Sequence, residues 1–180
     1  LELFNSYSAP GLVTKLTNLY NSPFERITYT AAVELYNSHN PNTQIEWGDD
    51  LSSEVEKYIC EKIYDNATII YNYPSAIKAF YMKENDDGKT VQAFDILMPG
   101  IGEIVGGSIR EERYDVLKSK LEANNISVES LQWYLDLRKF GTCPHGGFGV
   151  GFERLIMLLT GTTNIRDVIP FPRYPNHCVC

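Results

Sequence analysis

His145-Gly-Gly-Phe-Gly-Val-Gly-Phe-Glu-Arg154 runs directly into the apolar segment 155–159, which predicts a glycine-rich strand followed by a helix. Glycine recurs at every second position from 147 to 151, which is the period of a β-strand. One face of that strand therefore has no side chains, and a flat ligand can lie against its backbone. Arg154 follows one turn into a predicted helix, where a guanidinium can stack on a purine and donate to phosphate oxygens. The alternative is a glycine-rich bend that packs a strand against a helix, with Arg154 in solvent.

A second stretch, residues 94–112, predicts two apolar strands joined by a Pro-Gly turn, with Asp95 on the first strand and Glu103 on the second. A buried carboxylate without a partner is costly or loses its charge, so a cation is its natural partner. Magnesium takes one or two carboxylates and leaves its other positions to water and phosphate. The glycines at 106–107 clear space beside this predicted site. The alternatives are an edge-facing Asp95 and a Glu103 on the surface of its strand.

These two stretches resemble the catalytic domain of class II aminoacyl-tRNA synthetases, in the aspartyl, asparaginyl and lysyl subgroup. Residues 145–160 are similar to motif 3 of that class. Within the subgroup the similarity is closest to the asparaginyl enzymes, because Glu111-Glu112 follows Arg110 where the aspartyl enzymes typically have isoleucine and histidine. Four blocks in the family's order extend the resemblance over nearly the whole chain: residues 26–30, 77–82, 106–115 and 164–173.

The resemblance implies ATP-dependent activation of L-asparagine to an adenylate, with release of pyrophosphate, followed by transfer to tRNA(Asn). It implies an α+β fold, with an antiparallel β-sheet flanked by helices, and a homodimer for the full-length enzyme. The amino acid's own carboxylate attacks the α-phosphate, so catalysis depends on positioning and charge neutralisation and needs no nucleophilic side chain.

The resemblance also implies roles for residues of this chain. Asp95 and Glu103 would bind Mg²⁺, in a site where related enzymes often have a serine at the position of Gly106 as a further ligand. Arg110 and Gly147 would bind the amino acid. A guanidinium only donates hydrogen bonds, so Arg110 cannot distinguish an amide oxygen from a carboxylate oxygen, and the acceptor for the amide NH2 is expected upstream. The glycines of 146–151 would form a floor under adenosine and amino acid. The expected ATP contacts are Glu103, Gly151, Phe152, Glu153 and Arg154, with Glu103 and Arg154 as the expected catalytic residues.

Nothing in residues 1–180 resembles motifs 1 and 2 of the class, or the N-terminal anticodon-binding barrel of this subgroup. Residues 1–25 are similar to the helical connector that follows motif 2. We therefore interpret the sequence as the C-terminal portion of the catalytic domain, which should not make the adenylate alone. Three alternatives are an aspartyl-tRNA synthetase, an asparagine-forming paralogue, and a non-catalytic binding fragment.

Composition is that of a globular domain, since hydrophobic residues make up 43% and charged residues 22% of the 180 residues. No apolar run is long enough to cross a bilayer and the start does not read as a signal peptide, so a cytoplasmic protein without membrane contact is expected. The net charge of −7 argues against a stand-alone nucleic-acid binder. A tRNA would therefore be bound through the full-length enzyme.

The cysteines do not have the spacing of a disulfide framework, so reduced thiols are expected. The less favoured alternative is a zinc site, although Cys-x-Cys at a chain end is not a usual zinc spacing. Its ligands would come from Cys143, His145, His177, Cys178 and Cys180.

Periodicity and turn residues predict the secondary structure. The predicted elements, in chain order, are a helix at 28–38, a helix at 53–64, strands at 67–72 and 78–84, and helices at 110–123 and 127–139. Ser53 with Glu56 is the predicted capping box of the second helix, and Asp87-Gly88 a hairpin turn.

Several other residues are assigned structural roles. Lys78 could approach a phosphate, but a position in solvent on its strand is expected. Glu111, Glu112 and Arg113 are expected to open a helix, where acids favour the helix dipole. Arg138 and Lys139 could contact substrate or the tRNA end. Four aromatic residues are expected to form one cross-strand cluster: Tyr71, Tyr73, Phe80 and Tyr81.

Overall fold

The computed structural model describes residues 1–178 and contains one five-stranded sheet in the order β1-β2-β3-β4-β5. The strands are β1 (Glu25–Thr28), β2 (Thr68–Pro74), β3 (Thr90–Met98), β4 (Gly102–Ile109) and β5 (Gly146–Val150). β1 runs parallel to β2, whereas the pairs from β2 to β5 are antiparallel. The predicted α+β class, with an antiparallel sheet flanked by helices, is confirmed, and β1 adds one parallel pair to it.

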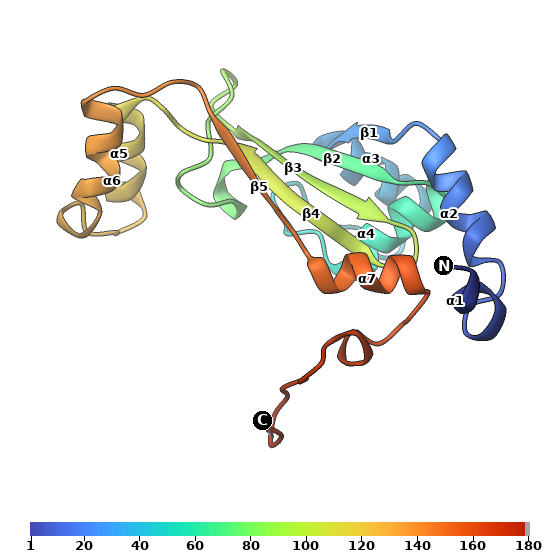
Figure 1. The fold of residues 1–180 in the computed structure, drawn as a ribbon. Coiled ribbons are helices and arrows are strands. Elements are labelled where there is room, and N and C mark those ends of the chain that lie inside the picture. The colour runs from blue at the N-terminus through green and yellow to red at the C-terminus, as the bar shows by residue number, and fades with distance from the viewer. Residues whose placement is uncertain (179–180) are drawn as a thin grey trace.

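Helices surround this sheet on several sides (Figure 1). The α-helices are α1 (Glu2–Tyr7), α2 (Leu12–Asn21), α3 (Tyr29–His39), α4 (Ser53–Lys57), α5 (Tyr114–Ala123), α6 (Gln132–Lys139) and α7 (Phe152–Thr160). A π-helical turn, η1 (Tyr58–Ile63), continues α4, and the 3-10 turns are η2 (Ser75–Ile77), η3 (Glu129–Leu131) and η4 (Ile165–Val168).

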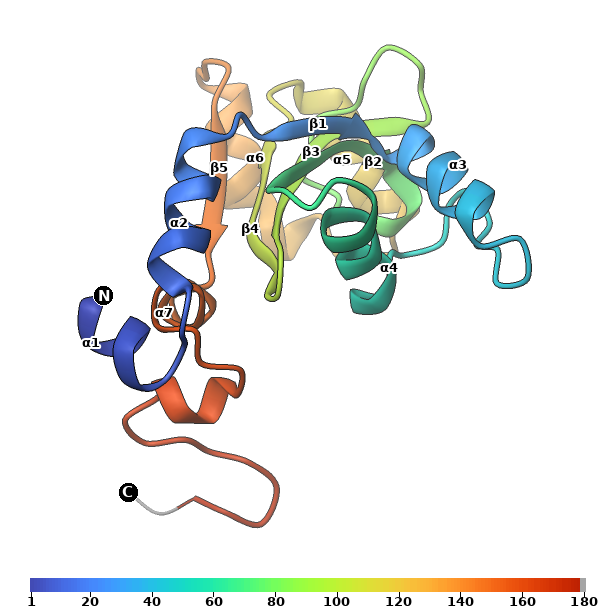
Figure 2. The same ribbon diagram turned by 90° about the vertical axis from the view of Figure 1, so that its right-hand side faces the viewer.

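The main hydrophobic core lies between the sheet and the helices α3, α4 and η1, which gather on one side of it (Figure 2). Tyr29, Ile59, Ile70 and Leu97 are among its fully buried side chains. A second, smaller core joins α5 and α6, which form a helical pair at the far end of β4 and β5 (Figure 1). The sheet therefore connects two separately packed parts.

One face of the sheet is shared between this main core and a set of polar residues. Along β3 the buried positions alternate, and Ala93 and Leu97 point into the core with Asp95 between them. Across β3 and β4, Asp95 pairs with Gly106 and Leu97 pairs with Glu103, because a bulge shifts the register between these two pairs. The bulge brings both carboxylates to the same face.

Most predicted elements are confirmed. The helix at 28–38 is α3, and the strand at 67–72 is β2. The capping residue of the second predicted helix is Ser52 and not Ser53, one residue earlier than expected. The Ser52 hydroxyl accepts a hydrogen bond from the backbone N–H of Val55. That helix continues to Ile63 through the π-helical turn.

The predicted strand at 78–84 is wrong. Both edges of β3 are already paired along residues 94–97, with β2 on one side and β4 on the other, so this segment reaches β3 only beyond the end of the β3–β4 ladder, at residues 90–92. It forms turns and two isolated bridges, Met82 with Arg110 and Glu84 with Val91. The helix predicted from 110 starts only at Tyr114, because residues 110–113 are extended and bonded to this same segment.

Candidate active site

Asp95 and Glu103 converge on the space above Gly106. A β-carbon at position 106 would lie 3.1 Å from Asp95 Oδ1 and 2.8 Å from Glu103 Oε1, so a side chain there would require the carboxylates to shift. The predicted cleared space is therefore present. Two carboxylate oxygens over a residue without a side chain fit magnesium, which takes one or two carboxylates and leaves room for water and phosphate.

The second oxygen of each carboxylate faces a cation. Lys78 Nζ lies 2.8 Å from Asp95 Oδ2, with both side chains largely buried. Arg154 Nη1 lies 4.0 Å from Glu103 Oε2, in a more exposed setting. The expectation that Lys78 lies in solvent is wrong: its ammonium sits 3.9 Å from the centre of the Tyr73 ring, and the ring and Asp95 together offset its charge.

Arg110 lies over Gly147 at the end of β4. A β-carbon at position 147 would stand 3.0 Å from Arg110 Nη2, and the guanidinium carbon is 4.5 Å from the centre of the Tyr81 ring. The backbone N–H of Arg110 donates to the carbonyl of His145, which ties it to the start of β5. The two residues predicted to bind the amino acid are thus in contact. Tyr81 as a support for Arg110 was not predicted from the sequence.

The glycines of β5 extend the same face. Gly149 pairs with Gly106 and Gly147 with Ser108, so the bare positions of β5 adjoin the two carboxylates. A β-carbon at position 149 would meet no other atom within 4 Å, which makes this part of the sheet a flat, open platform. Phe148 belongs to the opposite face, where the β-carbon of a residue at 107 would clash with it.

Arg154 closes one end of this platform. It is the third residue of α7, and its guanidinium donates to the backbone carbonyl of Glu103. A β-carbon at Gly151 would touch the Arg154 side chain at 3.5 Å, so the turn between β5 and α7 brings the guanidinium close to the strand. Phe152 is exposed and lies at the first position of α7, and Glu153 follows it.

Glu56, from α4, adds a third acid near this face. Burial, as the main cause, and the negative charges of Glu103 and Asp95 together raise the pKa of its carboxyl to about 7. Its Oε2 atom lies 4.0 Å from the position of a β-carbon at Gly102, at the start of β4. No sequence pattern near Glu56 indicates this proximity, which depends on how α4 packs on the sheet.

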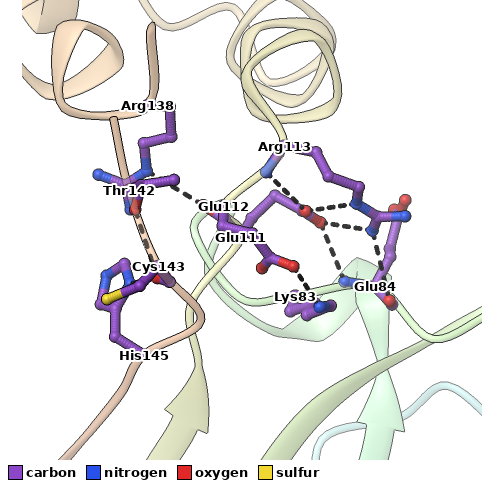
Figure 3. Close-up of polar contacts among 9 residues, drawn as sticks. All are labelled: Lys83, Glu84, Glu111, Glu112, Arg113, Arg138, Thr142, Cys143 and His145. Carbon is purple, nitrogen blue, oxygen red and sulfur yellow. Dashed lines mark hydrogen bonds and ion pairs between the residues drawn. The ribbon is translucent and has the colours of Figure 1, made fainter. Parts of the chain in front are cut away.

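The prediction that Glu111, Glu112 and Arg113 open a helix is wrong. Glu111 is fully buried, and its carboxylate accepts from the Glu84 amide and from the Arg113 guanidinium (Figure 3). Burial by itself would raise the pKa of Glu111, but these hydrogen bonds outweigh it and the pKa lies below its ordinary value. Lys83 pairs with Glu112 and lowers the pKa of that carboxyl.

Arg138 belongs to the same network and is 7% exposed, so the structure does not present it to a substrate. It donates to the Glu111 carbonyl at 3.1 Å and to the Tyr134 hydroxyl at 2.9 Å. The bond to the Glu111 carbonyl fastens α6 to the segment that carries Arg110 (Figure 3), whereas the bond to Tyr134 lies within α6.

The expected single aromatic cluster is also wrong. Tyr73 packs against Tyr29 in the main core, at 5.4 Å between ring centres. Phe80 instead packs against Tyr81 and Tyr134 beside α6. The turn after β2 separates the two pairs, because residues 78–84 do not continue as a neighbouring strand.

The zinc alternative finds no support within residues 1–178, where no group of three metal-binding side chains comes together. Cys60, Cys143 and Cys178 are free thiols, and Cys180 lies outside the described residues. The imidazole of His145 bonds to the Cys143 carbonyl at 2.9 Å. In this described part of the chain, no helix has the length and apolar character needed to cross a bilayer.

Comparison with known proteins gives a consistent result. The family described as tRNA synthetases class II (D, K and N) matches residues 6–175. The chain is 50% identical to the asparagine–tRNA ligase of Desulfotalea psychrophila, over 100% of this chain and 40% of that protein. It is 53% identical to the one from Clostridium botulinum, over 97% of this chain and 38% of that protein. The chain thus spans about two fifths of the length of these curated relatives.

Solved structures agree with the sequences. Asparaginyl-tRNA synthetase from Pyrococcus horikoshii, complexed with asparaginyl-adenylate, superposes with a TM-score of 0.84 at 42% identity, over 91% of this chain and 37% of that one. An aspartyl-tRNA synthetase from Entamoeba histolytica gives a TM-score of 0.80 at 30% identity, over 88% of this chain and 33% of that one. With its fold and its sequence in agreement, the chain belongs to the class II tRNA synthetases of the D, K and N group and is similar to asparagine–tRNA ligases over its whole length.

Proposed function

We propose that the chain forms part of the active site of an asparagine–tRNA ligase, which activates asparagine with ATP and transfers it to tRNA(Asn). The observation that carries this proposal is the arrangement of one sheet face. Arg110 over Gly147 forms one end, the Asp95 and Glu103 carboxylates over Gly106 form the centre, and Arg154 lies at the other end. A related asparaginyl-tRNA synthetase with 42% identity holds asparaginyl-adenylate.

In this proposal, Arg110 binds the side-chain carbonyl of asparagine. Its guanidinium is held against the Tyr81 ring, and the missing side chain at Gly147 leaves room for the amino acid. The bare backbone of β5 takes the adenosine, and Gly151 to Arg154 surround the nucleotide. Arg154 donates to a phosphate or stacks on the base, since a guanidinium can do both.

Asp95 and Glu103 would hold magnesium, which when bound neutralises negative charge on the ATP phosphates. The residues of this chain align the reactants. The carboxylate of asparagine attacks the α-phosphorus, pyrophosphate leaves, and the adenylate stays on the glycine platform. A ribose hydroxyl of the tRNA then attacks the asparaginyl carbonyl and AMP leaves. Both steps need aligned reactants and charge stabilisation, with no nucleophilic side chain.

We propose that tRNA and the second subunit of a homodimer are bound by the longer protein to which this chain corresponds, in the cytoplasm. The curated relatives are more than twice as long as the chain, which leaves ample sequence for both.

The test is ATP–pyrophosphate exchange with magnesium, run on this chain and on an N-terminally extended protein that carries it. Exchange that depends on asparagine and is much weaker with aspartate supports the proposal. Exchange driven by aspartate assigns the chain to an aspartyl enzyme, which Arg110 alone does not exclude. No exchange from a folded, extended protein refutes an activating role.

A further inference from the structure

Asp95 presents its two oxygens to different surroundings. Oδ1 faces the space over Gly106 that it shares with Glu103, and Oδ2 is bonded to Lys78 at 2.8 Å. A cation in that space can therefore reach only one oxygen of Asp95, as long as the ammonium holds the other.

Lys78 is held in place by its own surroundings. It follows η2 directly, and its ammonium lies against the Tyr73 ring at 3.9 Å while it bonds Asp95. Its side chain is 17% exposed and that of Asp95 is 11% exposed, so water competes weakly for this bond. A charge-assisted hydrogen bond in such a setting fixes the orientation of a carboxylate.

The number of oxygens that a carboxylate offers matters for the choice of metal. Magnesium requires near-ideal octahedral geometry and uses single oxygens, whereas calcium takes six to eight oxygens and accepts two from one carboxylate. A site in which each carboxylate directs one oxygen toward a neighbouring cation suits the smaller ion. Glu103 shows the same division, with Oε1 over Gly106 and Oε2 facing Arg154.

We propose that Lys78 is a positioning residue that keeps Asp95 monodentate and thereby makes the paired-carboxylate site select Mg²⁺ over Ca²⁺. This inference rests on the proposed function, which assigns the metal to Asp95 and Glu103. The positive charge of Lys78 alone would weaken the binding of both ions to a similar extent. The ratio of the two affinities therefore isolates the geometric effect.

The experiment measures Mn²⁺ bound to the chain from the electron paramagnetic resonance signal of free Mn²⁺, and then its displacement by Mg²⁺ or Ca²⁺. In Lys78→Met, the Ca²⁺ affinity should rise about tenfold relative to the Mg²⁺ affinity, the smallest effect usual for loss of a group that orients a metal ligand. In Lys78→Gln, whose amide can still donate to Oδ2, both affinities should change together and the ratio should stay near that of the wild type.

Lys83→Met serves as the matched control, because Lys83 also forms a partly buried ion pair but with Glu112. It should leave both affinities unchanged. If Lys78→Met shifts both affinities by the same factor, or if Lys78→Gln alters the ratio as strongly as Lys78→Met, Lys78 acts through charge only and the inference is wrong. Asp95→Asn distinguishes failure of the proposed function from failure of the inference about Lys78. If this variant binds Mn²⁺ as tightly as the wild type, Asp95 and Glu103 do not form the metal site. Circular dichroism verifies the fold of each variant.

Discussion

The carboxylate of Glu111 holds the guanidinium of Arg113 at two points, with Oε1 to Nε at 2.6 Å and Oε2 to Nη2 at 2.8 Å. Only one residue separates them in sequence, yet Glu111 is fully buried and the Arg113 side chain is 46% exposed. The pair closes the extended segment between β4 and α5, directly after Arg110. It neutralises a buried charge at the place where the helical pair joins the sheet.

Arg113→Ala should destabilise the chain by about 3 kcal/mol, because it leaves the Glu111 carboxylate buried without its cation. Urea unfolding measures the loss. Lys118→Ala removes an exposed pair with Glu122 at 3.8 Å and should cost less than about 1 kcal/mol. Equal effects of the two substitutions would mean that burial of Glu111 contributes nothing.

Glu56→Gln should change how stability depends on pH. The folded pKa of Glu56 is raised from its ordinary 4.5 to about 7, chiefly by burial, so the folded chain keeps a proton that the unfolded chain releases. The contribution of Glu56 to the free energy of unfolding is therefore most favourable below pH 4.5, falls as the pH rises to about 7, and is constant above that pH.

The melting temperature of Glu56→Gln should accordingly exceed that of the wild type at pH 8 and approach it at pH 4.5. Thermal unfolding across this range provides the measurement. Glu54→Gln, an exposed change in the same helix, should shift the melting temperature little at any pH. If the melting temperatures of Glu56→Gln and the wild type differ by the same amount at all pH values, the raised pKa of Glu56 is not the cause of the difference.

Gly106→Ala should weaken Mn²⁺ binding and lower the rate of exchange about tenfold, because its methyl would stand 2.8 Å from Glu103 Oε1 and 3.1 Å from Asp95 Oδ1. The carboxylates must then shift, and a methyl, unlike a serine hydroxyl, supplies no metal ligand in return. Gly149→Ala tests the neighbouring platform. Its methyl meets nothing within 4 Å, so metal binding and stability should persist while the KM for ATP rises. Identical effects of the two substitutions would show that the metal and the nucleotide do not occupy separate parts of the face.

Arg110→Lys should raise the KM for asparagine about tenfold to a hundredfold with little change in the KM for ATP. Lysine keeps the charge but loses the planar donors and the stacking on Tyr81. Exchange kinetics in the extended protein give both constants. Arg166→Lys changes another arginine stacked on a tyrosine, 4.2 Å from the Tyr174 ring, and serves as the control. A larger rise in the KM for ATP than for asparagine would contradict the assignment.

The parts of the site that sequence could predict are those with a local signal. The glycine alternation of residues 147–151, the strands of Asp95 and Glu103, and the arginine early in α7 all depend on neighbours in the chain. The two carboxylates lie on one face of the sheet because of the bulge between β3 and β4, and no residue pattern in these strands predicts that bulge.

The predicted positions of charged residues whose partners lie far away in the sequence are wrong. Lys78 and Glu111 both look like surface residues by type, and each is paired through the fold. Lys78 meets Asp95 because the chain turns after β2, and Glu111 is buried because α6 and the 81–84 turn close over it. The charged residues of this chain were harder to place than its apolar ones, since a partner decides their burial.

The strand order also has a consequence for the time course of folding. β3 and β4 are joined by a short turn, whereas the 36 residues at 110–145 separate β4 from β5 and the 39 residues at 29–67 separate β1 from β2. Pairings between distant segments form late, because a long loop must close first. We expect the hairpin with Asp95 and Glu103 to form early, and both β1 and the glycine strand β5 to dock later. The glycine platform should then gain protection later than this hairpin in pulsed hydrogen exchange.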